Sequence, residues 1–273
     1  MSVLRILRKD IVRDAAGSSV SPALVSGMGA DVGQQDNRKT SRTTSTASQD
    51  INYTWSTNQI VNMVAVARHN WTDAATLRVR LYSDTALTTL LYDSTALDAF
   101  DGSVLPSPFD IASARFRNLK NTVFYFAEQT TVKGLKLTIA DASNPDGYME
   151  HARVLAGQYF QPAYGAPYGG ASLKPATASK FRRTDGGDRI ADQRGTWREL
   201  SLSLHQVPDS DYDDFAAIVT YHDKVLPTWV SVRATAGGAL ELMNQMWAGI
   251  DDMGPFDPAM YALHRLPLVF GEV

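Results

Sequence analysis

Apolar and polar residues alternate strictly in several short segments of the chain. In the segment 76–82, the apolar positions are Leu77, Val79 and Leu81, and the intervening positions are Arg78, Arg80 and Tyr82. The same two-residue period returns at 134–139 and at 200–204. This period is typical of an antiparallel strand with one buried face, so the chain is predicted to be mainly β.

Further strands are predicted where short apolar runs stand between turn residues. In the first part of the chain these runs are Ile60–Ala67, Leu90–Tyr92, Val123–Ala127, Leu135–Ile139 and Tyr148–Ala156. The stretch Asn144-Pro145-Asp146-Gly147 is a strong turn signal before the last of them. Regularly spaced short strands of this kind predict a jelly-roll β-sandwich over residues 51–157.

The C-terminal part, residues 158–273, is predicted to form a second β domain that carries one helix. Its expected strands are Trp197–His205, Trp229–Arg233, Ala239–Met246 and Leu263–Phe270. The helix is expected near 209–222, where Tyr212, Phe215, Ile218 and Val219 form an apolar stripe. Asp209 or Ser210 is expected to cap its first turn. The Pro-, Gly- and Tyr-rich stretch 158–170 is interpreted as the connector between the two domains.

Residues 1–50 are predicted to form an N-terminal strand followed by an extended arm. Residues 14–50 are rich in Gly, Ser, Thr, Asp and Asn, and 34–48 has almost no apolar side chain. Such a segment buries too little surface to offset its ordering entropy alone, so we expect it to order against a neighbour. An alternative is that Met1–Val12 pairs with the C-terminal strands.

Composition excludes several classes of protein. The chain has no cysteine, which rules out disulfides and thiolate metal sites, and its net charge is only -3. No apolar run approaches the roughly 20 residues of a membrane span. The basic stretch 174–198 has two interpretations, a surface that faces nucleic acid or a solvated hairpin. The hairpin is favoured, because only Phe181 and Trp197 are interleaved aromatics.

No catalytic, cofactor-binding or metal-binding motif is recognisable, and the sequence predicts a protein that is not an enzyme. The acids of 209–214 resemble the start of a calcium loop, but the loop's Gly at the sixth place and Glu at the twelfth are missing, and helix capping explains all of these acids without a metal. The glycines of 27–33 only approximate a dinucleotide-binding fingerprint. The five histidines are scattered and lack metal-ligand spacing.

Aromatic residues are the best candidates for binding contacts. They lie near expected strand ends and in the connector, and they are Tyr53, Trp55, Trp71, Tyr159, Tyr164 and Tyr168. Exposed aromatic rings stack on sugars and anchor protein interfaces, whereas buried ones are core residues. The sequence leaves both interpretations open.

Four segments together resemble a known family. They are Ala67–Asp84, Tyr92–Ser94, Thr138–Glu150 and Arg153–Gly157, and they are similar to tail-tip or baseplate structural proteins of long-tailed bacteriophages. The resemblance implies a jelly-roll module, similar to carbohydrate-binding modules, on a domain that joins the end of the tail tube. It implies no ligand residues.

Two functional hypotheses follow. In the first, the chain is a structural virion protein of the tail tip, assembled in the host cytoplasm. It would form a ring or trimer and would bridge the tail tube, hub and fibre proteins. In the second, it is a carbohydrate-binding or adhesion module that recognises glycans of the host surface. Neither hypothesis involves a membrane, a cofactor or nucleic acid.

Overall fold

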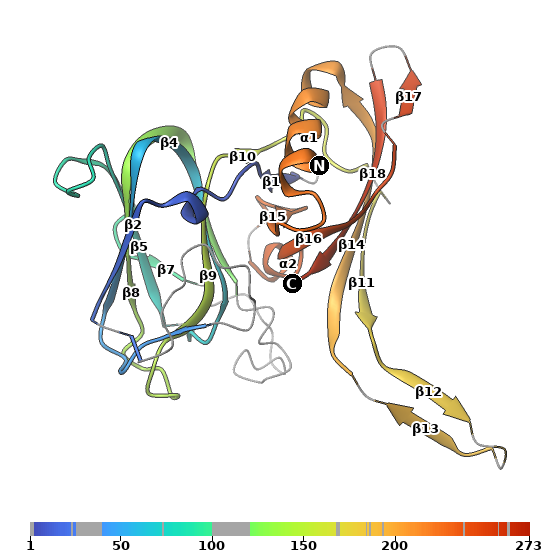
Figure 1. Ribbon diagram of the computed structural model, residues 1–273, viewed down its shortest axis with the longest axis horizontal. Helices are drawn as coiled ribbons and strands as arrows, with labels where there is room; N and C mark the ends of the chain where they lie inside the picture. The colour runs from blue at the N-terminus through green and yellow to red at the C-terminus, as the bar shows by residue number, and fades with distance from the viewer. Residues whose placement is uncertain are drawn as a thin grey trace. The chain divides into compact units, whose positions relative to one another are not determined.

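The computed structural model describes residues 3–22, 24–25, 40–72, 74–99, 121–167, 170–183, 185, 187–192, 194–236, 238–255, 257–260 and 263–273. The fold is mainly β with one main helix, as predicted (Figure 1). Contacts divide the chain into two units. The sandwich unit consists of Val3–Gln161 and Thr228–Met246, and the hairpin unit of Pro162–Pro227 and Trp247–Val273. The domain boundaries expected at residues 50 and 157 stay predictions.

The sandwich unit contains one large antiparallel sheet that closes into a jelly roll. Its strands are β2 (Gly17–Ser21), β3 (Ser41–Arg42), β4 (Gln49–His69), β5 (Thr76–Tyr82), β6 (Leu90–Asp93), β7 (Leu97–Asp98), β8 (Thr122–Ala140) and β9 (Glu150–Gly157). The order is β3-β9-β4-β8-β5-β6, with β2 paired to β4 and β7 paired to β5.

Two long strands turn this sheet into a sandwich. Gln49–Thr54 of β4 pairs with Gly134–Ile139 of β8, and after a register shift residues 59–66 of β4 pair with residues 122–132 of β8. Strands β4 and β8 therefore contribute to both layers. In Figure 1, β4 arches from the layer of β2 and β5 to the layer of β9. The predicted strands Val123–Ala127 and Leu135–Ile139 are two parts of β8.

The core of the sandwich lies between these layers, and the alternating pattern of β5 points into it. Leu77, Val79 and Leu81 are fully buried, as the sequence predicts. They pack in one apolar cluster with the side chains of Trp55 and Trp71. Burial of each large apolar side chain is worth roughly 1.5–3 kcal/mol, so this cluster is the main source of the unit's stability.

Part of the segment 14–50 belongs to the sandwich, which corrects the expected extended arm. The 3-10 helix η1 (Ile11–Asp14) contributes Ile11 and Val12 to the core, β2 pairs with β4, and β3 pairs with β9. The polar residues of β2 and β3 satisfy their backbone groups by joining existing sheet edges, which the composition alone does not reveal. Residues 26–39, with the glycines 27–33, lie outside the described residues.

A buried ion pair fixes this N-terminal segment. Asp10 accepts hydrogen bonds from the backbone N–H of Val12 (3.1 Å) and from Arg153 Nη2 (2.9 Å) on β9. Burial raises the pKa of Asp10, and the Arg153 charge opposes that effect. Removing one member of such a pair leaves the other charge buried without a partner, which is costly. The pair therefore holds η1 in place on the sheet.

The sandwich unit also contains four shorter elements. They are β1 (Arg5–Leu7), β10 (Tyr159–Phe160), β15 (Thr228–Ser231) and α2 (Gly238–Met243). Strand β1 pairs with both β10 and β15, so the N-terminal strand does pair with a strand from the C-terminal part of the chain. The single strand predicted at Ala239–Met246 is wrong, because 238–243 is helical. Ala, Leu, Glu and Met are all strong helix formers, which explains the helix.

The hairpin unit is a second antiparallel sheet with one helix. Its elements are β11 (Ala171–Thr177), β12 (Lys180–Arg183), β13 (Arg189–Asp192), β14 (Thr196–Pro208), α1 (Asp209–His222), β17 (Asp257–Met260), β18 (Leu263–Glu272) and the part of β16 (Gln245–Met253) from Trp247 onward. Strand β18 pairs with β16, β14 and β17, and β11 pairs with β14. Strands β12 and β13 form a separate two-stranded ribbon, the hairpin favoured for 174–198.

Helix α1 confirms the predicted helix near 209–222. Phe215, Ile218 and Val219 are buried, and the helix contacts β14 and β18. The predicted cap is wrong, because Pro208 occupies the N-cap position and no side chain caps the helix. The Asp209 carboxylate instead accepts a hydrogen bond from His264 Nε2 (2.8 Å), and Asp211 accepts one from Ala163 N.

Candidate functional site

Three of the six predicted contact aromatics lie inside the sandwich. Tyr53, Trp55 and Trp71 are buried members of its core cluster. The indole Nε1 of Trp55 donates a hydrogen bond to the Ile11 carbonyl (2.7 Å), and the Trp71 ring stacks on the His69 ring at 4.1 Å. This corrects their assignment as glycan or interface contacts, because an inward-facing side chain cannot reach a ligand outside the folded sheet.

The connector tyrosines have different environments. Tyr159 is half-buried, and its ring lies 4.5 Å from the guanidinium carbon of Arg5 and 5.4 Å from the Tyr125 ring. Tyr164 is 54% exposed and remains available for contact. Tyr168 lies outside the described residues.

The strand register gathers loops at one end of the sandwich. The first residue of β4, Gln49, pairs with Ile139 near the end of β8, and the last, His69, pairs with His151 at the start of β9. The segments 70–75 and 141–149, which follow β4 and β8, therefore meet at this end. Eight residues here make up what we call the end-loop cluster: Arg42, Asn70, Thr72, Asp141, Asn144, Asp146, Tyr148 and Glu150.

Buried polar side chains form the base of this cluster. Asp141 accepts hydrogen bonds from the Thr72 hydroxyl (2.6 Å), from Thr72 N (2.8 Å) and from Asn144 Nδ2 (3.0 Å). Asn144 Oδ1 in turn accepts from Asp146 N, which closes the predicted Asn-Pro-Asp-Gly turn. A saturated network of this kind holds the backbone rigid, which lowers the entropy lost when a ligand binds.

Asn70 connects this base to the surface. Its Nδ2 donates to Asp146 Oδ2 (2.9 Å) and to the Tyr148 carbonyl (3.0 Å), and its Oδ1 accepts from Glu150 N (2.7 Å). One amide therefore sets the positions of three residues that lie nearer to solvent.

The surface of the cluster combines an aromatic ring with an ion pair. Arg42 Nε donates to Glu150 Oε2 (2.9 Å), and Arg42 Nη2 donates to the Tyr148 hydroxyl (3.0 Å). The guanidinium carbon lies 3.9 Å from the centre of the Tyr148 ring. All three side chains are partly exposed, and the Glu150 carboxylate raises the pKa of Arg42. An aromatic ring beside fixed donors and acceptors is the usual composition of a small-ligand site.

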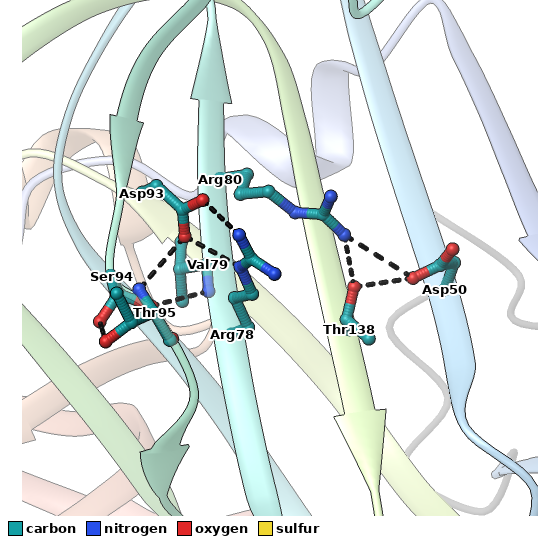
Figure 2. Close-up of polar contacts among 8 residues, drawn as sticks. All are labelled: Asp50, Arg78, Val79, Arg80, Asp93, Ser94, Thr95 and Thr138. Atoms are coloured by element: carbon teal, nitrogen blue, oxygen red, sulfur yellow. Dashed lines mark hydrogen bonds and ion pairs between the residues drawn. The ribbon is translucent and has the colours of Figure 1, made fainter.

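Polar side chains also lie on the outward-facing positions of β4, β5, β6 and β8, and we call them the outer ladder; Figure 2 shows Asp50, Arg78, Arg80, Asp93 and Thr138 of this set. Because opposite residues of antiparallel strands share a face, its residues lie in two rows across the strands. One row contains Asp50, Thr138 and Arg78, and the next contains Asn52, Lys136, Arg80 and Asp93.

The charges of the outer ladder are paired with one another. Arg78 Nε donates to Asp93 Oδ1 (2.8 Å), and this contact lowers the pKa of Asp93 to about 2. Asp50 lies 2.7 Å from Lys136 Nζ and accepts from the Thr138 hydroxyl. Burial opposes ionisation of Asp50, but these contacts outweigh it and lower its pKa. Because both carboxylates already have partners, the ladder is best explained as cross-strand stabilisation of the sheet.

Metal-binding side chains are not brought together among the described residues. No group of three or more His, Asp or Glu side chains placed to hold a metal ion occurs in this part of the chain. His69 and His151 are buried near Trp71, and His222 is buried in α1. Among the described helices, none is long and apolar enough to cross a membrane.

Comparison with known proteins finds no matching family model and no matching curated protein. Several solved structures are similar to the chain, with low identity. The family 32 carbohydrate-binding module of AlyQ, in complex with 4,5-unsaturated mannuronic acid, is 17% identical over 52% of this chain and 95% of its own (TM-score 0.33). The family 32 module of Clostridium perfringens NanJ, in complex with galactose, is 11% identical over 57% of this chain and 99% of its own (TM-score 0.38). At these values, neither a ligand nor a site is transferred to this chain.

Sequence reasoning did not identify the surface residues of the end-loop cluster. The turn Asn144–Gly147 was a signal for a rigid loop, and Asn70 stands directly after a strand. Arg42 lies in the polar segment that was expected to be an arm, and its partner Glu150 is 108 residues away. Only the pairing of β3 with β9 brings these two residues together.

Proposed function

We propose that the chain is a non-catalytic glycan-binding protein and that the end-loop cluster holds the sugar. The observation that carries this proposal is the partly exposed Tyr148 ring beside the Arg42–Glu150 ion pair, on a hydrogen-bonded base. An aromatic ring offers a flat apolar surface to the C–H face of a pyranose. Guanidinium and carboxylate groups can bind neighbouring hydroxyls in two-point contacts.

The charge of the cluster favours a neutral sugar. Among its eight defined residues, Arg42 is the one cation, against the carboxylates of Asp141, Asp146 and Glu150. A uronic acid would bring another negative charge close to these groups, and like charges in a partly desolvated site cost binding free energy. We therefore expect neutral hexose glycans to bind better than polyuronates.

Titration calorimetry on purified protein tests this proposal. A panel of neutral oligosaccharides, with an oligouronate for comparison, is titrated into the wild-type chain and into Tyr148→Ala. The substitution removes the ring and is expected to weaken binding by about fivefold or more, since an aromatic contact of this kind is worth roughly 1 kcal/mol or more. Arg42→Gln is expected to weaken binding while the ring remains.

Tyr164→Ala provides the matched control, because it removes an exposed tyrosine from outside the cluster. It should bind as wild type. A Tyr148→Ala protein that melts at the wild-type temperature and binds with wild-type affinity would refute the assignment of the site. Failure of the whole neutral panel to bind would refute the function.

A structural role in a phage tail tip is the second candidate. The observation that favours it is the exposed ribbon of β12 and β13, since a component that joins several proteins needs contact surfaces beyond a sugar site. In this case the chain would be part of the virion, with other tail proteins as partners. Mass spectrometry of purified particles should then recover the chain in stoichiometric amounts, and its absence from particles would reject this role.

A further inference from the structure

The β12–β13 ribbon, residues 178–195, extends from the sheet of the hairpin unit, and we call it the projecting hairpin (Figure 1). It continues the β11–β14 pair through a short junction. There the Ser179 hydroxyl accepts from Arg194 N (2.8 Å), and Ala178 N donates to the Gly195 carbonyl (3.2 Å). These bonds align the two pairs of strands, so the hairpin has a defined register and is more than a loose loop.

Apolar side chains of the projecting hairpin are exposed on both of its faces. Phe181 is opposite Ala191 on one face, and Ile190 is opposite Arg182 on the other. Phe181 is 64% exposed and Ile190 is 43% exposed. All four residues of β12 are exposed.

Such a ribbon gains little from folding on its own. An isolated two-stranded hairpin is marginally stable in water, because neither face is covered and both edges keep unpaired backbone groups. Phe181 is followed in the sequence by Arg182 and Arg183, and aromatic residues and arginine are the residue types enriched at interface anchors. Contact with another protein surface would cover these groups.

The charge of the hairpin indicates what kind of protein surface it contacts. The hairpin contributes five of the 26 Lys and Arg residues and three of the 29 Asp and Glu residues. The rest of the chain therefore has 21 basic and 26 acidic residues. A basic projection on an otherwise acidic chain is complementary to a second copy of that chain. We propose that the projecting hairpin of one copy docks onto the rest of another copy, which has a net negative charge, with Phe181 as the apolar anchor and Arg182 as a charged contact.

This inference deepens the second candidate function and does not depend on glycan binding. Sedimentation velocity of the full chain over a dilution series tests it. Wild type should self-associate reversibly, and the double variant Phe181→Ser/Arg182→Glu should raise the dissociation constant by about tenfold or more. Its thermal unfolding should match wild type, because both side chains are exposed.

The chain offers a closely matched control in Lys224→Glu/Val225→Ser. This variant makes the same charge change and also removes an apolar side chain that is 64% exposed, but outside the hairpin. It should associate as wild type. A monomeric wild-type protein, or equal association of the hairpin variant and wild type, would overturn the proposal. Binding of duplex DNA by a monomeric wild type, lost with Arg182→Glu, would assign the hairpin to nucleic acid and would also overturn it.

Discussion

Trp55 stabilises the fold, although its residue type and its place near a strand end also suit a binding role. Its indole lies in the core, and its Nε1 donates to the carbonyl of Ile11 in the 3-10 helix η1. The residue therefore connects the N-terminal segment to β4. Tyr53 and Trp71 are buried in the same cluster, so ligand contacts must come from other side chains.

Trp55→Phe is expected to lower the free energy of unfolding by about 2 kcal/mol or more. The substitution leaves the Ile11 carbonyl buried without its donor and creates a small cavity. Urea titration measures the loss as a lower midpoint, and glycan affinity should not change. The opposite result, weaker glycan binding with an unchanged urea midpoint, would show that Trp55 belongs to the binding site.

For single residues, the sequence predicted which side chains face the core more successfully than it predicted which side chains contact a ligand. The alternation of 76–82 correctly placed Leu77, Val79 and Leu81 in the core and the two arginines outside it. It also placed Tyr82 on the polar face with the arginines, which is wrong, because Tyr82 is buried where its strand pairs with Gly134. For Trp55 the sequence could not decide, because an aromatic side chain near a strand end suits a core and an interface equally well.

Strands β4 and β9 carry a pair of buried histidines directly beneath the end-loop cluster. His69 is opposite His151, and the Trp71 ring lies near both. Burial lowers the pKa of His151 to about 4, although Glu150 beside it raises the pKa. On the adjacent strand β3, Ser41 pairs with His151, and Arg42 next to Ser41 is the nearest charge on that strand.

This pair predicts a loss of stability in acid. The unfolded chain binds a proton at His151 below about pH 6.5, whereas the native chain resists protonation until about pH 4. Stability contributed by neutral His151 is therefore complete above pH 6.5 and falls by about 3 kcal/mol as the pH drops to 4.

Unfolding free energies of wild type and His151→Gln measure this effect. The unfolding free energy of wild type minus that of the variant should decrease by about 3 kcal/mol between pH 7 and pH 4. A His151→Gln difference that is constant across this range would contradict the buried neutral imidazole.

Elements were predictable where one local pattern dominated. Helix α1 and strand β5 have the bounds expected from their apolar period. Strand β8 was predicted as two separate pieces, and only Ile60–Ala67 of β4 was predicted, because polar residues at their shared corner interrupt the apolar pattern. Residues 238–243 were predicted as a strand because an apolar run does not by itself distinguish a buried strand from a short helix.

At the scale of the whole molecule, the chain builds two units from segments that are not contiguous. It passes from the sandwich unit to the hairpin unit after Gln161, returns at Thr228 and leaves again after Met246. The mainly β architecture with one helix follows from the sequence. The end-loop cluster does not, because it depends on contacts between residues that are far apart in the sequence, 69 positions for Thr72 and Asp141 and 108 for Arg42 and Glu150.

Binding of a neutral glycan at the end of the sandwich should be visible residue by residue. Amide chemical-shift mapping of the labelled full chain, with and without a saturating neutral oligosaccharide, tests it most directly. We expect the largest shifts at Asn70, Asp146, Tyr148 and Glu150, with little change at Arg78 and Arg80 of the outer ladder. Shifts centred on the outer ladder or on the projecting hairpin, or no shifts at any sugar concentration, would contradict it.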